Sequence, residues 1–355
     1  MYFERINTIV PLTYLANLYH KLTLLSLRNR KLRDFNRFAN DLYKANYNLN
    51  HQSGKSGTLI VMIDEHTPKG GLVDKLKGIV SGYLLAELLQ YQFYVYIKVD
   101  NFPLYDFIRE RFPVYLQSGT NEAVSFNKKQ ARPVMIYNHL PLSFRWTVWR
   151  LRQISQIHLY CNLDLTCLIK KSTKTEAIRI WGQSFNKLFY FDTAIVNAFP
   201  AIPLNVKRIG VHLRFMSLLG DFQDSGVDPH LLPDQQVALI DLCKGRLKQL
   251  LTNDVSNSVF FLFTDSVRFI DSVLGDAEIA GMNRTFIADK KNIAHTGLMS
   301  EVSVLERAVR DFYFLSRCDK VYLIKGPGMH NSDFSRYSCY LQNTEFSIIH
   351  LDNNL

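Results

Sequence analysis

The sequence predicts an α/β protein, and three observations lead to this fold class. Apolar runs of strand length recur along the chain, helical patterns lie between most of them, and polar or glycine-rich segments follow several of the runs. Such alternation is typical of parallel sheets covered by helices. The 355 residues suit two domains or one large one, and 47% hydrophobic with 21% charged residues is ordinary for a globular protein.

The first predicted unit is strand–loop–helix–strand. TLIVMID at 58–64 is a continuous apolar run, which indicates a strand buried on both faces. A glycine-containing loop leads to a predicted helix over 75–91 and a second strand over 92–100. Further strands are predicted at 133–138, 156–162, 208–215, 258–266, 284–289 and 320–326, and long helices at 233–252 and 300–318.

We expect three segments along the chain. Residues 1–50 form a basic, mainly helical segment, because apolar side chains recur there at helical spacing. Residues 51–200 form a first α/β half, which ends in a helical connector after Asn162. Residues 201–355 form the second α/β half.

Basic residues concentrate in the N-terminal segment. Residues 1–50 carry half of the formal net charge of +10. This charge suits an anionic partner such as a membrane surface or a phosphorylated lipid, although a solvated helical face explains it equally well. Nucleic acid is discounted as a partner because no recognised nucleic-acid motif accompanies the charge.

The cysteines and the hydropathy pattern predict a cytoplasmic protein. The five cysteines are scattered and form no C-x-x-C pair, so we expect neither a disulfide framework nor a zinc site. No run reaches the roughly 18 apolar residues that span a bilayer, and the N-terminus does not match a signal peptide. An amphipathic helix in 1–50 would allow peripheral contact with the inner face of a membrane.

Three groups of polar residues follow predicted strands, where ligands of open α/β sheets bind. The first contains Gly70 and Gly71, between the strand at 58–64 and the next helix. Glycines there allow the backbone to approach an anion closely at a helix N-terminus. The spacing matches neither a Walker loop nor the G-x-G-x-x-G fingerprint, so a structural turn is as good an interpretation as a phosphate cradle.

The second group follows the strand at 208–215. Arg214 could direct its planar guanidinium at a diphosphate, and His212 lies on the same side of the strand. A structural ion pair with a buried histidine is the competing interpretation. Asp221 and Asp224 are candidates for the base that deprotonates an incoming hydroxyl, or they belong to a polar loop.

The third group combines two strand ends. Thr264, Asp265 and Ser266 end a very apolar strand, and KGPGMHNS links the last predicted strand to a helix near Ser332-Asp333. Serine and aspartate there are ordinary helix caps, although such an N-terminus could also bind phosphate. No D-x-D signature is present, which argues against a transferase that chelates its donor through a metal.

Taken in order, these segments resemble the fucosyltransferase superfamily, namely the α1,6-fucosyltransferases, the nodulation fucosyltransferases and the protein O-fucosyltransferases. GGLVDKLKG looks like their glycine-rich loop, GVHLRF like their H-x-R motif and FLFTDS like their strand ending in Thr-Asp. LERAVRDFYFLSRCDKVYLIKGPGMHNSDFSRYSCYL looks like their C-terminal segment. The order matches over about residues 58–345, with departures at Val73, Phe215 and Met216.

The resemblance implies a GT-B fold, in which two Rossmann-like domains (51–200 on the acceptor side, 201–355 on the nucleotide-sugar side) face a cleft. It implies an inverting transfer from a nucleotide sugar, GDP-fucose in the best-known members, with neither metal nor other cofactor. Arg214 would stabilise the β-phosphate and His212 would support that site. The resemblance assigns the following residues to donor binding: Gly70, Gly71, Asp74, Lys75, Thr264, Asp265, Ser266, Asn331, Ser332, Asp333, Phe334 and Arg336.

We therefore expect a glycosyltransferase that acts on a glycan or a lipid-linked glycan in polysaccharide biosynthesis. Two alternatives stay open. The same fold could use another activated sugar, or the chain could be a catalytically silent relative that binds glycans or partner proteins.

Overall fold

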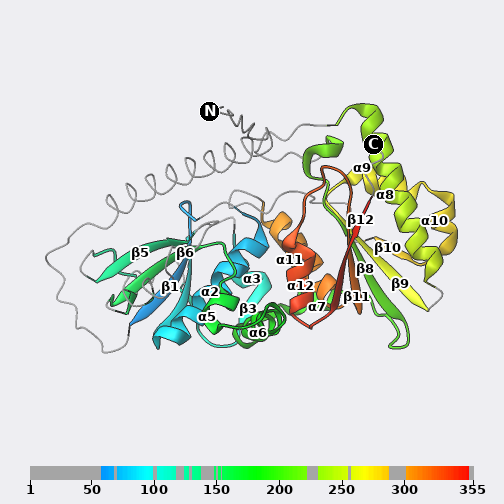
Figure 1. The fold of residues 1–355 in the computed structure, drawn as a ribbon. Helices are drawn as coiled ribbons and strands as arrows, with labels where there is room; N and C mark the ends of the chain where they lie inside the picture. The colour runs from blue at the N-terminus through cyan, green and yellow to red at the C-terminus, as the bar shows by residue number, and fades with distance from the viewer. Residues whose placement is uncertain are drawn as a thin grey trace, which may run out of the picture.

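The computed structural model confirms an α/β protein with two parallel sheets (Figure 1). It describes residues 57–67, 70–98, 102–116, 124–127, 130–136, 148, 151–152, 154–221, 231–254, 257–287 and 301–351. The predicted basic segment 1–50 and Asp224 lie outside the described residues.

The first sheet has the strand order β4-β2-β1-β6-β5, and every neighbouring pair in it is parallel. Its strands are β1 (Thr58–Ile63), β2 (Gln92–Ile97), β4 (Tyr115–Leu116), β5 (Ala131–Ile136) and β6 (Gln156–Cys161). The helices of this half are α2 (Leu72–Leu89), α3 (Leu104–Phe107), α5 (Thr166–Lys170) and α6 (Lys174–Leu188). A separate antiparallel pair joins β3 (Ile108–Glu110) to β7 (Phe189–Phe191).

The second sheet has the order β10-β9-β8-β11-β12 and is also parallel throughout. Its strands are β8 (Lys207–Leu213), β9 (Ser258–Thr264), β10 (Thr285–Ile287), β11 (Lys320–Lys325) and β12 (Glu345–His350). The remaining helices are α7 (Thr193–Asn197), the 3-10 turn η1 (Met216–Leu219), α8 (Pro233–Asn253), α9 (Val267–Leu274), α10 (Ala277–Met282), α11 (Val302–Ser316) and α12 (Asp333–Tyr340).

The predicted strands all form, with shifted ends. The strand expected from Pro133 begins at Ala131, because β5 is an edge strand where a proline interrupts no ladder on its outer side. The strand expected to reach Asp100 ends at Ile97. β12 was not predicted. It is an edge strand of the second sheet, and its half-buried side chains produce no apolar run in the sequence.

Helices α11 and α12 lie between the two sheets (Figure 1). Both follow residue 201 in the chain, yet Phe312 and Tyr337 belong to the hydrophobic core of the first half. The rings of Trp181 on α6 and Tyr337 on α12 meet edge to face, with their centroids 5.0 Å apart. The core of the first half is therefore built in part from helices of the second half, whose sheet also has hydrophobic clusters of its own.

The described part of the chain contains no helix with the length and apolar character needed to cross a membrane.

The contact between α6 and α12 depends on a glycine. A Cβ atom at Gly182 would overlap the carbonyl oxygen of Tyr340, whereas a Cβ at Gly245 on α8 meets no atom within 4 Å. Gly182→Ala should therefore push the helices apart and lower the free energy of unfolding by about 1–3 kcal/mol. Gly245→Ala should raise it by about 0.5–1 kcal/mol, since alanine favours the helix.

Urea unfolding of both variants checks this prediction. Equal stability of the Gly182→Ala variant and the wild type would show that the helices are not in close contact.

Candidate functional site

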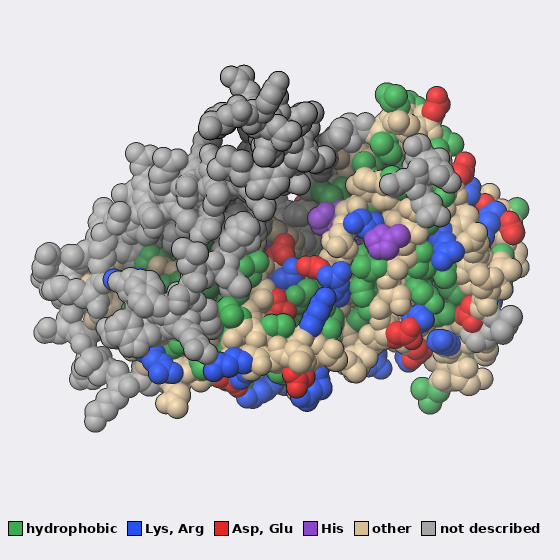
Figure 2. Space-filling view, in the orientation of Figure 1, with side chains coloured by type: hydrophobic (Ala, Val, Ile, Leu, Met, Phe, Trp, Pro, Cys, Tyr) green, Lys and Arg blue, Asp and Glu red, His purple; other side chains and the backbone are tan. Residues whose placement is uncertain are grey.

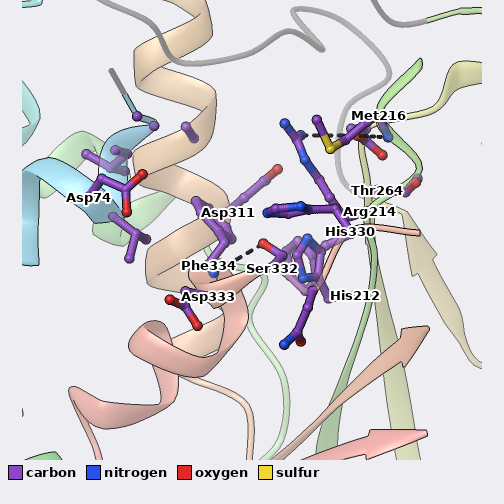
Figure 3. A pocket seen from close by; sticks show the side chains of 18 of the residues that line it. Asp74, His212, Arg214, Met216, Thr264, Asp311, His330, Ser332, Asp333 and Phe334 are labelled. Atoms are coloured by element: carbon purple, nitrogen blue, oxygen red, sulfur yellow. Dashed lines mark hydrogen bonds and ion pairs between the residues drawn. The ribbon is translucent and has the colours of Figure 1, made fainter. Parts of the chain in front are cut away.

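A cleft of about 520 Å³ lies between the two halves (Figures 2 and 3). It opens beyond the carboxyl ends of β8 and β9, and the first turns of α2 and α12 and one face of α11 complete its walls. β8 has β9 on one side and β11 on the other, so the strand order reverses at β8. Open α/β sheets bind their ligands at such a point.

Arg214 follows β8 directly and projects into this cleft (Figure 3). Its Nη1 lies 3.1 Å from Oδ2 of Asp265, the residue that follows β9. The strand register pairs Leu213 with Thr264, which brings the residues after them to the same edge of the sheet. The Arg214 side chain is 18% exposed, so a buried carboxylate positions its guanidinium, which still faces the cleft.

The Asp265 carboxylate also holds the backbone that follows Arg214. Its Oδ1 accepts a hydrogen bond from the Phe215 N–H and its Oδ2 accepts one from the Met216 N–H, both at 2.8 Å. Met216 has a φ of 54°, a left-handed conformation that is uncommon for a residue other than glycine. Burial raises the pKa of Asp265, while Arg214 and the two amides act in the opposite direction.

His212 lies behind Arg214 and is buried. Its Nδ1 is 3.0 Å from Oγ of Ser335 on α12, and its ring centroid is 5.8 Å from that of Phe334. Burial, together with Arg214 and His330, lowers its pKa to about 3, so the imidazole is neutral near pH 7. His212 lines the cleft.

The glycine pair forms the opposite wall. Gly71 is the N-cap of α2, and no side chain caps this end of the helix. A Cβ at Gly70 would collide with Asp74. Lys77 lies one turn into the helix. Its Nζ is 3.1 Å from Oδ1 of Asp74 and 2.7 Å from Oδ2 of Asp333 on α12, so it joins the two walls.

The sequence prediction missed one wall of the cleft. Val304, Arg307, Ala308 and Asp311 line it from α11. Their spacing of three and four residues places them on one helical face. Two charged residues on this otherwise apolar face were the signal in the sequence that could have indicated a binding surface. Arg307 Nε lies 3.4 Å from Asp311 Oδ2, and both side chains are nearly buried.

The loop between β11 and α12 contributes His330, Asn331 and Ser332. Ser332 caps α12 by accepting a hydrogen bond from the Phe334 N–H at 3.2 Å, which is the ordinary role of a serine there. Asn331 and Phe334 also line the cleft as expected. His330 was not among the predicted site residues.

Four predicted residues are absent from the lining, and each has other partners. The Lys75 ammonium donates to the Gly70 carbonyl and lies 5.2 Å from the Phe102 ring centre. Arg336 pairs with Asp333 at 3.0 Å.

The other two predicted residues outside the lining, Ser266 and Asp221, meet at the start of α9. Ser266 is the N-cap of this helix, and its hydroxyl donates to Asp221 at 2.8 Å. The same oxygen of Asp221, Oδ2, also accepts the Arg268 N–H at 2.8 Å, so Asp221 is engaged at the start of this helix. Within the described ranges, no three His, Cys, Asp or Glu side chains gather as a metal site.

Comparison with known proteins gives structural matches alone. No family model matches the chain, and no curated protein matches it significantly. A variant of Arabidopsis thaliana FUT1 in complex with GDP is 11% identical with a TM-score of 0.53, covering 92% of this chain and 79% of that one. NodZ α-1,6-fucosyltransferase of Bradyrhizobium, soaked with GDP-fucose, is 17% identical with a TM-score of 0.47, covering 81% and 93%. POFUT1 in complex with GDP-fucose is 11% identical with a TM-score of 0.40, covering 85% and 99%.

The match to FUT1 shows that this chain shares its fold over most of its length. The predicted resemblance to the fucosyltransferase superfamily is thereby confirmed at the level of the fold.

Buried neutral histidines make the stability of this protein sensitive to acid. The pKa of His212 is about 3 in the folded chain against 6.5 ordinarily, and His158 behaves likewise. Below about pH 6.5 the unfolded chain therefore binds protons that the folded chain does not, so stability falls as the pH falls. Each histidine should cost about 1.4 kcal/mol at about pH 5.5.

Urea unfolding at about pH 7.5 and about pH 5.5 measures this loss. In the His212→Gln variant the loss should be smaller by about 1.4 kcal/mol. His350→Gln, at the exposed end of β12, is the matched control and should leave the loss unchanged. An unchanged loss in His212→Gln would contradict the neutral, buried state of His212.

Proposed function

We propose that this chain is a GT-B glycosyltransferase that moves a sugar, fucose from GDP-fucose as our first choice, to a hydroxyl of an acceptor. The transfer inverts the anomeric carbon and uses no metal. The two parallel sheets are the two domains of the GT-B fold, and the cleft between them holds the donor. The similarity of fold to FUT1, a variant of which has a structure in complex with GDP, supports GDP as the donor nucleotide.

The observation that carries the proposal is the position of Arg214. Its guanidinium is permanently charged, faces the cleft and is held by the buried carboxylate of Asp265. A fixed cation at the end of β8 favours a ligand that gains negative charge during the reaction. A diphosphate leaving group is such a ligand.

The reaction we propose is a single displacement. The acceptor oxygen attacks the anomeric carbon, and the bond from that carbon to the diphosphate oxygen breaks in line with it. The bonding electrons leave with the nucleoside diphosphate, whose growing charge Arg214 stabilises. The acceptor proton passes to a base, and inversion follows because attack and departure occur on opposite faces of the sugar.

One observation favours the alternative of a silent, glycan-binding relative. Each carboxylate that lines the described cleft has a basic partner: Asp74 and Asp333 pair with Lys77, Asp265 with Arg214 and Asp311 with Arg307. A carboxylate in an ion pair is a poor base. Turnover of a nucleotide sugar decides between the two functions.

Replacement of Arg214 tests the transferase directly. With the donor that stabilises the protein most in a thermal panel of nucleotides and nucleotide sugars, Arg214→Ala should lower kcat by about 10²–10³-fold, because a fixed charge at the leaving group is lost. Turnover should persist in EDTA. Product formation is followed by release of the nucleoside diphosphate.

The matched control is Arg208→Ala. Arg208 lies at the opposite end of the same strand and also pairs with an aspartate, Asp319, at 2.8 Å. This variant loses an arginine–aspartate pair without touching the cleft, so its kcat should stay near that of the wild type. Absence of binding by every nucleotide would exclude both donor choices and leave the silent relative.

We also propose that the acceptor is a glycan or a lipid-linked glycan at the inner face of a membrane. The basic residues of 1–50 would bind the anionic surface there, with each one near the surface contributing about 1 kcal/mol. Replacing Arg28, Arg30, Lys31 and Arg33 by glutamine should sharply weaken sedimentation with phosphatidylserine vesicles at low salt. Sedimentation equal to that of the wild type would mean that this segment does not bind the membrane.

A further inference from the structure

We infer that His330 binds the diphosphate of the donor beside Arg214 and takes up a proton as the diphosphate enters the cleft. The inference rests on the proposed function, since it concerns the donor that the cleft would hold. It assigns a role to a residue outside the predicted site, and it gives donor binding a dependence on pH.

The backbone places His330 next to Arg214. His330 lies in the loop after β11, which pairs with β8, and its N–H donates to the Arg214 carbonyl at 3.2 Å. Its own carbonyl accepts the Ser332 N–H at 3.0 Å, so the start of α12 fixes the loop on the other side. Figure 3 shows the ring pointing into the cleft beside Arg214.

The imidazole is available to a ligand. His330 is an exposed residue, and within the described ranges its ring has neither a hydrogen bond nor an ion pair. The neighbouring His212 differs in both respects, because it is buried against Ser335. A histidine whose ring makes no hydrogen bond or ion pair to the described residues, and which faces an anion site, is suited to donate a hydrogen bond to the anion.

The balance of charge in the cleft favours a proton on this ring once an anion is bound. The described lining carries the basic Lys77, Arg214 and Arg307, and four acidic residues. A sugar diphosphate brings two further negative charges. Protonation of His330 would add a cation where the excess of negative charge arises, and the proton would come from solvent and return there when the product leaves.

The groups that face His330 explain why the ring is neutral beforehand. They come from the ends of β8 and β9, from α2 and α12, and across the cleft from α11: Arg214, His212, Asp265, Asp74, Asp333, Arg307 and Asp311. The cleft walls remove part of the water around the ring although the residue is exposed overall, and this desolvation, followed by Arg214, lowers the pKa of His330 below 6.5. The carboxylates act more weakly in the opposite direction. A diphosphate between Arg214 and the protonated His330 ring would screen their repulsion and raise the pKa of His330.

Linkage makes this inference measurable. If binding raises the His330 pKa by about one pH unit, the affinity for the anion must rise by up to about tenfold as the pH falls through that range. His212 cannot produce this change, because its pKa of about 3 keeps it neutral throughout.

The first experiment is an NMR titration of the His330 ring, assigned with the His330→Gln variant. Sulfate is the first probe because it does not itself titrate between about pH 5 and pH 8, and chloride at equal ionic strength is the reference. We expect the His330 pKa to be higher in sulfate by about one pH unit, and this difference to vanish in Arg214→Ala. An equal pKa in both salts would overturn the inference.

The second experiment measures the dissociation constant of GDP-fucose from about pH 8 to about pH 6. Its diphosphate is a diester and gains no proton in this range. Binding should tighten several-fold toward the lower pH in the wild type, stay constant in His330→Gln, and be tight and constant in His330→Lys. The exposed His350→Gln variant is the matched control and should behave as the wild type.

The outcomes separate this inference from the proposed function. A sulfate-dependent His330 pKa without turnover of any nucleotide sugar would support the anion site and reject the transferase. If His330→Gln binds the donor with the affinity of the wild type but loses kcat, His330 acts as a base in the reaction and does not bind the diphosphate. This result would overturn the inference.

Discussion

The candidate site depends on the carboxylate of Asp265. This one group accepts two backbone hydrogen bonds, from Phe215 and Met216, and pairs with Arg214. Burying an aspartate is costly unless its oxygens are satisfied, and here the cost is offset by three donors from the end of the neighbouring strand. The same contacts hold Met216 in a left-handed conformation and direct the guanidinium into the cleft. Loss of the carboxylate would therefore remove the acceptor of two backbone N–H groups and the ion-pair partner of Arg214 at once.

A second constraint keeps the walls of the cleft together. α11 and α12 belong to the second half by sequence, but they pack into the core of the first half. Gly182 allows α6 to approach the end of α12, and Lys77 joins Asp74 and Asp333 at the other end of that helix. These packing contacts and ion pairs set the distance between the two sheets. The cleft thus has a defined width to which a diphosphate could be matched.

Much of the architecture was predictable, because a parallel strand buried on both faces leaves a continuous apolar run in the sequence. β1, β8 and β9 were found this way. β12 was missed because an edge strand is only half-buried and lacks that signal. The residues that end β8 and β9 were also found, since polar groups immediately after a buried strand must lie at the edge of the sheet.

The sequence by itself determined the two series of buried strands and the polar residues that follow them, because burial and strand length leave a local pattern. Only the tertiary structure decided which of those residues meet. Arg307, Asp311 and His330 stand 93 to 116 positions from Arg214 in the chain, and nothing in their local sequence connects them to it, yet they line the same cleft. Asp221, in contrast, lies seven positions from Arg214 and is engaged at the start of α9. The physical reason is that a strand order which reverses at β8 brings distant segments together at one edge, and no spacing along the chain records that reversal.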